Sequence, residues 1–203
     1  MSFGLYNPKP LLIVLSGPSG VGKDAILASL KGQDTSLHFV VTATTRPPRP
    51  NERDGVDYFF LSREQFERMI ANGEFIEHAR VYQDYKGIPK SQIEAAFASG
   101  KDAIVRVDVQ GAARLRSLYP EAVLAFVVPE DVPEWLRRLK GRETETRESL
   151  HVRLETVRTE LAMVHLFDYV IVNAEGKLEE AVATLLHIID AEHHRLRPRQ
   201  VNA

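Results

Sequence analysis

Runs of consecutive apolar residues alternate with amphipathic segments along most of this 203-residue chain. A continuous run of branched apolar residues predicts a strand buried on both faces, and apolar residues three and four positions apart predict a helix. The predicted strands of this kind cover residues 11–15, 37–41, 103–107, 122–128 and 168–172. The predicted helices between and after them cover residues 24–30, 89–98, 110–118 and 178–194. This alternation predicts an α/β fold in which helices cover both faces of a central parallel sheet.

Two stretches interrupt the alternation. The first predicts, in order, a proline-rich loop over 42–55, a strand over 56–61, a helix from 62 to about 73, a strand over 74–82 and a turn near Gly87. The second, residues 129–166, is rich in arginine and predicts helix, with a mobile elbow at the charge-dense segment 140–148. The end of the chain, residues 195–203, is expected to be a loose tail.

Composition narrows the class of protein. Hydrophobic and charged residues occur at ordinary frequencies, and a net charge of −2 predicts neither a nucleic-acid-binding nor a membrane-binding surface. The absence of cysteine excludes disulfides, thiolate metal sites and cysteine nucleophiles, and it favours a reducing cytoplasm. No apolar run approaches the length of a membrane span, and the first ten residues lack a secretory pattern. We therefore expect a cytoplasmic protein of one domain.

The first predicted strand leads directly into Gly17-Pro18-Ser19-Gly20-Val21-Gly22-Lys23, and a helix follows. This spacing in a strand–loop–helix context is typical of a phosphate-binding loop, whose main-chain N–H groups and lysine surround nucleotide phosphates. The next residue is Asp24, where the motif has a serine or threonine that ligates Mg²⁺. A carboxylate can bind Mg²⁺ directly or through water, but it also places negative charge beside the phosphates. The role of Asp24 is therefore left open.

A second candidate site lies in the proline-rich loop. Two arginines, Arg46 and Arg49, with Tyr58 beyond them, match the geometry of a phosphate, and the alternative is a solvated basic loop. Farther along, Glu77 stands between apolar residues. One carboxylate can accept both N–H groups of the pairing edge of guanine, which adenine lacks, so Glu77 is a candidate reader of guanine. The alternative is an ordinary surface residue of a strand.

A third candidate group consists of Arg138, Arg142 and Arg153, which could stabilise charge on a transferred phosphoryl group. The alternative is a charged helix face that pairs with the neighbouring glutamates. The loops at Gly17 and Thr42, together with Asp108 and Asn173, all follow predicted strands, so they can meet at one edge of the sheet. The histidines show no metal-binding spacing, and the serines of the loop show no hydrolase triad.

These motifs together resemble the guanylate kinases, from about residue 9 to residue 192. The segments that carry the resemblance are 17–23, Thr44-Thr45-Arg46-Pro47-Pro48-Arg49, Glu74-Phe75-Ile76-Glu77, Asp108-Val109-Gln110-Gly111, 138–142 and Val170-Ile171-Val172-Asn173. The resemblance implies transfer of phosphate from ATP to GMP, giving ADP and GDP, with Mg²⁺ as cofactor. It also implies a P-loop nucleoside monophosphate kinase fold with three parts: a core (9–41, 89–129 and 162–194), a small α+β GMP-binding insertion (42–88) and a helical lid (130–161).

The resemblance further assigns roles to residues. It implies that Asn173 lies near the adenine of ATP. It also implies that ATP is bound by residues of the phosphate loop and the helix that follows: Gly17, Pro18, Ser19, Gly20, Val21, Gly22, Lys23, Asp24 and Ala25. It implies that the phosphate of GMP is bound by Arg46, Arg49, Tyr58 and Lys86, and that Glu52 supports their loop. It implies that guanine is recognised by Thr42, Glu77 and Asp108. For the transfer it implies Lys23, Arg46, Arg138, Arg142 and Arg153. Asp24 is a candidate Mg²⁺ ligand because of its carboxylate and not because of the resemblance.

Four positions depart from the family pattern. Besides Asp24, Lys86 stands in place of a tyrosine, Ile88 in place of a hydroxyl residue, and Arg106 where an acidic residue is common. A plastid-like and bacterial subgroup shares the Gly-Lys-Asp and Lys-Gly-Ile-Pro segments, so we interpret these as subgroup traits. The rival hypotheses are a ribose 1,5-bisphosphate phosphokinase and a non-catalytic interaction module of similar fold. The choice between GMP and dGMP, and between monomer and homodimer, is left open.

Overall fold

The computed structural model describes residues 6–33, 36–50, 52–81, 83–140 and 158–201. A central sheet is built from five strands in the order β2-β7-β1-β8-β9, and every neighbouring pair is parallel. Their bounds are β1 (Leu12–Ser16), β2 (His38–Phe39), β7 (Ala103–Arg106), β8 (Val123–Val128) and β9 (Tyr169–Val172). The predicted parallel sheet is confirmed, although β2 is shorter than the apolar run suggested.

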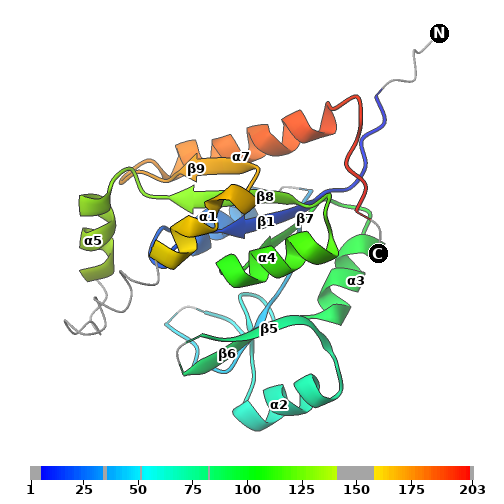
Figure 1. The fold of residues 1–203 in the computed structure, drawn as a ribbon, viewed down its shortest axis with the longest axis vertical. Coiled ribbons are helices and arrows are strands. Elements are labelled where there is room, and N and C mark those ends of the chain that lie inside the picture. The colour runs from blue at the N-terminus through cyan, green and yellow to red at the C-terminus, as the bar shows by residue number, and fades with distance from the viewer. Residues whose placement is uncertain (1–5, 34–35, 51, 82, 141–157, 202–203) are drawn as a thin grey trace.

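Helices cover both faces of this sheet, as predicted (Figure 1). One face carries α1 (Lys23–Gly32) and α7 (Leu178–His193), and the other carries α3 (Lys90–Ala98) and α4 (Val109–Leu118). Side chains of β1 alternate between the two faces of the sheet. Ile13 and Leu15 belong to the core under α1 and α7, and Leu12 and Val14 belong to the core under α3 and α4. Farther along the chain lie α5 (Val132–Lys140) and the 3₁₀ turn η1 (Val164–Leu166). Among the described helices, none has both the length and the apolar character needed to cross a membrane.

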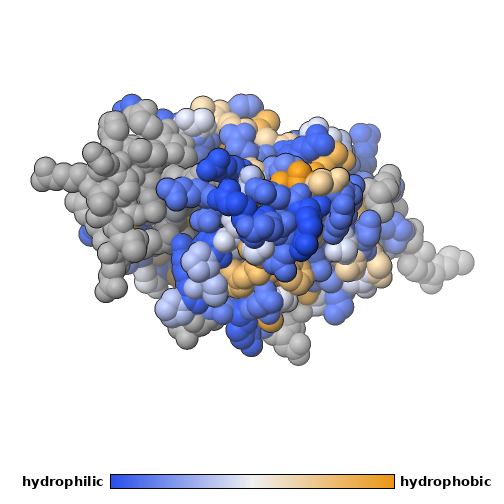
Figure 2. All heavy atoms as spheres, turned by 90° about the horizontal axis from the view of Figure 1, so that it is seen from below, coloured by the Kyte–Doolittle hydropathy of each residue, from blue (hydrophilic) through white to orange (hydrophobic). Residues whose placement is uncertain are grey.

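A second, four-stranded sheet belongs to residues 42–89 and has the order β4-β3-β6-β5. The strands are β3 (Ala43–Thr44), β4 (Phe59–Phe60), β5 (Phe75–Val81) and β6 (Asp84–Pro89), and the helix α2 (Arg63–Ala71) lies between β4 and β5 in the sequence. The helix α2 begins with the expected capping box, in which Ser62 and Gln65 exchange hydrogen bonds. Phe66 of this helix stacks on Phe75 at 4.3 Å and on Tyr85 at 5.2 Å, which closes a small core. Seen from this end, most of the surface formed by the described residues is hydrophilic (Figure 2).

Two local predictions in this region are wrong. Residues 42–55 were expected to be loop throughout, but Ala43 and Thr44 form β3 because β6 offers them a partner strand. The turn expected near Gly87 is also wrong, since β5 and β6 pair from Phe75 opposite Pro89 to Val81 opposite Asp84. Gly87 lies within β6, where a Cβ would approach the ring of Phe75 to 2.8 Å. The glycine therefore permits close packing rather than a reversal of the chain.

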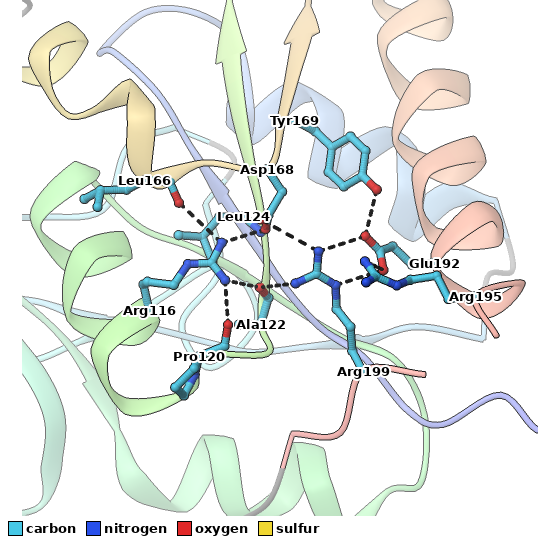
Figure 3. A network of polar contacts seen from close by, with 10 residues as sticks. All are labelled: Arg116, Pro120, Ala122, Leu124, Leu166, Asp168, Tyr169, Glu192, Arg195 and Arg199. Carbon is cyan, nitrogen blue, oxygen red and sulfur yellow. Dashed lines mark hydrogen bonds and ion pairs between the residues drawn. The ribbon is translucent and has the colours of Figure 1, made fainter. Parts of the chain in front are cut away.

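The predicted loose tail is wrong for residues 195–201. Arg199 donates to both carboxylate oxygens of Glu192, at 2.8 and 3.0 Å, and lies 3.7 Å from Asp168 (Figure 3). Glu192 is buried and also accepts a 2.7 Å hydrogen bond from Tyr169. Burial alone would raise the pKa of Glu192, but the hydrogen bonds from Arg199 and Tyr169 outweigh it and lower the pKa. This buried ion pair fastens the end of the chain to the start of β9.

We expect the Arg199→Met variant to lose about 2 kcal/mol of unfolding free energy, because it leaves the buried carboxylate of Glu192 with fewer partners. The contribution of a carboxylate with a lowered pKa is present above its unfolded pKa and disappears as the pH falls through the folded pKa. The loss should therefore be largest at pH 7 and shrink below about pH 4. Urea unfolding across this range measures it, with the exposed Arg197→Met as control. Equal destabilisation by both variants would contradict the anchoring role of Arg199.

Candidate active site

A cavity of about 690 Å³ opens where the carboxyl ends of β1 and β7 meet the small second sheet. Fourteen of the residues that the sequence nominated line this cavity: Gly17, Ser19, Gly20, Gly22, Lys23, Asp24, Ala25, Thr42, Arg46, Arg49, Tyr58, Glu77, Lys86 and Asp108. They come from segments more than 80 residues apart, and parallel strands bring them together, as expected. A volume of this order is typical of a small-molecule site.

The phosphate loop has the backbone geometry that its glycines predict. Gly17, Gly20 and Gly22 all have positive φ, at 138°, 89° and 93°. A Cβ on Gly17 would meet the carbonyl oxygen of Val127 at 2.2 Å, so no larger residue fits there. Lys23 opens α1, and its ammonium donates to the carbonyl of Gly17 and, at 2.9 Å, to that of Pro18. Burial lowers the pKa of Lys23 to about 8, so an anion in the loop would stabilise the charged form.

Arg46 is held in place by Glu52. Two guanidinium nitrogens of Arg46 donate to the two carboxylate oxygens at 2.7 Å, and the main-chain N–H of Arg49 donates to the same carboxylate at 2.7 Å. The guanidinium also lies 4.9 Å from the centre of the Tyr58 ring. Glu52 thus fixes the loop that carries both arginines, which leaves them preorganised for an anion.

Two carboxylates, Glu77 and Asp108, face the cavity near each other. Asp108 caps α4 and accepts from the N–H of Gly111 at 2.9 Å, which fixes its orientation. Burial, together with the negative charge of Asp108, raises the pKa of Glu77 to about 7. Such a group changes its hydrogen-bonding character near neutral pH, which makes it a candidate functional residue. Ile88, beside them, is 1% exposed and packs into the core next to α3.

The helix α5 lies behind the phosphate loop. Arg138 donates to the carbonyl oxygens of Asn173 at 2.8 Å and Val21 at 3.4 Å, and it pairs with Glu134. The amide of Asn173 donates to the carbonyl of Val21 at 2.7 Å. Arg138 and Asn173 therefore support the loop and do not line the cavity in this structure. Arg142 and Arg153, and nearly all of the elbow predicted at 140–148, lie outside the described residues.

Sequence reasoning did not assign several residues of this site. The indole N–H of Trp135 donates to the carbonyl of Ser19 at 2.9 Å, and nothing in the sequence pattern marks this contact. Glu160 lines the cavity, and burial raises its pKa although Lys23 opposes the shift. Arg106 lines the cavity as well and forms an ion pair with Asp24. The sequence held one signal for this pair: both residues depart from the family pattern, Asp24 with a negative charge and Arg106 with a positive one.

Comparison with known proteins gives one consistent answer. The family model described as "Guanylate kinase" matches residues 9–192. A guanylate kinase 2 of rice (Oryza sativa subsp. japonica), described as chloroplastic/mitochondrial, is 49% identical over 96% of this chain and 69% of its own length. A guanylate kinase of Shouchella clausii is 42% identical over 93% of this chain and 91% of its own length. The crystal structure of guanylate kinase from Anaplasma phagocytophilum superposes with a TM-score of 0.73 at 30% identity, over 95% and 90% of the two chains.

Proposed function

Because the chain belongs to the guanylate kinase family, we propose that it transfers the γ-phosphoryl group of ATP to GMP, giving ADP and GDP. The observation that carries this proposal is the shared cavity, which is lined by both the phosphate loop with Lys23 and the carboxylate of Glu77. An ATP molecule held by the loop and a purine held by Glu77 would meet within this one cavity. Positioning of this kind supplies most of the catalysis in phosphoryl transfer.

We propose that guanine is recognised by Glu77, Asp108 and Thr42. The ionised carboxylate of Glu77 would accept from the N1–H and N2–H groups, and a purine without this donor pair would leave the carboxylate unpaired. The phosphate of GMP would lie among positive and hydroxyl groups that line the same cavity: Arg46, Arg49, Tyr58 and Lys86. In this arrangement Lys86 serves as a point charge where a tyrosine is common in the family.

The main-chain N–H groups of the phosphate loop and of the start of α1, residues 19–25, would hold the phosphates of ATP, with Lys23 adding a full positive charge. Lys23 and Arg46 would stabilise the charge that develops on the transferred group. Arg138, Arg142 and Arg153 are proposed for the same task, and Asn173 for the adenine side, on the family resemblance. In the described structure Arg138 and Asn173 instead hold the loop from behind.

ATP of this reaction class carries Mg²⁺, which is usually held by phosphates, waters and one or two carboxylates. Within the described part of the chain, no three acidic or histidine side chains form a ready metal site. Asp24 lines the cavity next to Lys23, and 53% of its side chain is exposed. One exposed carboxylate fits a magnesium ion that is bound mainly by the phosphates of ATP. Asp24 would then be its protein ligand, directly or through water. The ion would neutralise phosphate charge.

Other features of the proposal follow the family. We propose a role in purine nucleotide metabolism, a cytoplasmic location and a monomer or homodimer, with GMP or dGMP as acceptor. The rice relative is described as chloroplastic/mitochondrial, so location is a separate question for this chain. A ribose 1,5-bisphosphate phosphokinase would have no use for Glu77. A non-catalytic module would not need the intact phosphate loop from Gly17 to Lys23.

The proposal is tested by a coupled assay of ADP release with MgATP and four acceptors: GMP, AMP, UMP and ribose 1,5-bisphosphate. We expect kcat/KM for GMP to exceed that for each of the others by at least about 1,000-fold, because the wrong acceptor leaves buried polar groups unpaired. A preference for the sugar phosphate would establish the rival kinase. No turnover of any acceptor, with nucleotide still bound, would favour the non-catalytic module.

A further inference from the structure

Arg106 lies at the end of β7, beside the strand that leads into the phosphate loop. In the sheet it is paired with Leu15 of β1, and its side chain is only 13% exposed. Its guanidinium group lies 4.3 Å from the centre of the Tyr58 ring, closer than the 4.9 Å of Arg46. The guanidinium group of Arg106 thus lines the cavity, and it lies against the same phenol ring as that of Arg46.

Asp24 holds this guanidinium group from the other side. One terminal nitrogen of Arg106 donates to the carboxylate of Asp24, and the other is 3.4 Å from the carbonyl oxygen of Asp57. Asp24 is in the first turn of α1, where the helix dipole favours a negative charge. Burial alone would raise the pKa of Asp24, but the positive charges of Arg106 and Lys23 lower it, so the carboxylate is ionised at neutral pH.

A guanidinium group has five N–H donors, and these contacts leave some of them for a ligand. The contacts with Asp24, Asp57 and Tyr58 also restrict the side chain, so less freedom is lost when a ligand binds. We propose that Arg106 binds the phosphate of the acceptor nucleotide and that Asp24 is the residue that positions it. This deepens the proposed function and rests on it, and it gives the two unusual residues a shared task.

Asp24 has two opposing effects on a bound phosphate. It orients Arg106, which favours binding, and its own negative charge repels the anion. Because about half of the Asp24 side chain is exposed and its charge is paired, solvent and Arg106 screen the repulsion. Orientation therefore dominates, and the loss of Asp24 should weaken phosphate binding.

The test compares the affinities of GMP and guanosine by calorimetry, in EDTA and without ATP, so that no metal bound at Asp24 contributes. For Arg106→Met we expect GMP affinity to fall about 10- to 100-fold while guanosine affinity stays within about twofold, since only the charge-assisted bonds to phosphate are lost. Arg106→Lys should lie between this variant and the wild type. The control Arg53→Met removes the same charge from a residue outside the cavity lining and should change neither affinity.

Asp24→Asn should weaken GMP binding about 3- to 10-fold in the wild-type background, because Arg106 loses the partner that orients it. In the Arg106→Met background the same substitution should no longer weaken GMP binding and should tighten it slightly, because only the repulsion between Asp24 and the phosphate remains to be removed. Unchanged GMP affinity in Arg106→Met would overturn the proposal, and equal losses for GMP and guanosine would reduce Arg106 to a structural role. Unchanged or tighter binding in Asp24→Asn would refute the positioning role of Asp24. Failure of the wild type to prefer GMP over guanosine would instead count against the proposed function.

Discussion

The Glu77→Gln variant is expected to raise the KM for GMP about 100-fold while the KM for ATP changes less than about threefold, because the amide cannot accept both N–H donors of guanine. Glutamine has nearly the same shape as glutamate, so the cavity should keep its form. Steady-state kinetics with each substrate varied in turn measure the two values. Equal rises in both KM values would refute the role of Glu77 in reading the base.

The same carboxylate predicts a pH dependence. Burial and the charge of Asp108 raise the pKa of Glu77 to about 7 in the free protein, so the group is increasingly protonated as the pH falls. Since guanine needs the ionised form, the KM for GMP should rise about tenfold for each pH unit below 7 and level off above it. In Glu77→Gln this slope should vanish. A slope that persists in the variant would assign the titration to another group.

The Lys23→Met variant is expected to lower kcat by at least about 1,000-fold, because it removes a positive charge of the cavity lining from the place where the transferred phosphoryl group would gain negative charge. The residual kcat is measured by assays that are stopped after long incubation. The control Lys177→Met removes the same charge from an exposed ion pair with Glu180 and should keep normal turnover.

Lys23 also donates to two carbonyl oxygens of its own loop, so a folding defect has to be separated from a chemical one. Thermal unfolding and GMP binding should stay near wild-type values in Lys23→Met, since the acceptor residues belong to other segments. Loss of GMP binding together with turnover would show that the variant disturbs the whole cavity rather than the transfer step.

Much of the fold followed from short-range patterns. The apolar runs of β1, β7 and β8 are long and continuous, and turn residues bound them, so strand type and parallel pairing were predictable. The capping box at Ser62 and the glycines of the phosphate loop are local signals with one structural reading. The candidate cavity followed from the same patterns, because residues after parallel strands meet at one edge.

The features that escaped prediction depend on distant partners. Two residues, Ala43 and Thr44, become a strand only because β6 lies beside them, and Gly87 serves packing against Phe75 rather than a turn. Arg199 fastens a tail that looks solvated in the sequence, because its carboxylate partner is buried one helix turn before the tail. Likewise, the departures at Asp24 and Arg106 stand 82 positions apart, and only the sheet register makes them neighbours.

The hydrogen bonds behind the phosphate loop, from Trp135 of α5 and from Asn173 after β9, have a consequence for substitutions away from the cavity. Trp135 and Asn173 occupy the carbonyl oxygens of Ser19 and Val21 on the outer side of the loop, which keeps those peptide groups from rotating. A change at either side chain would free a peptide plane next to the proposed ATP site. Substitution of Trp135, which does not line the cavity, is therefore expected to change ATP affinity through the rear of the loop alone.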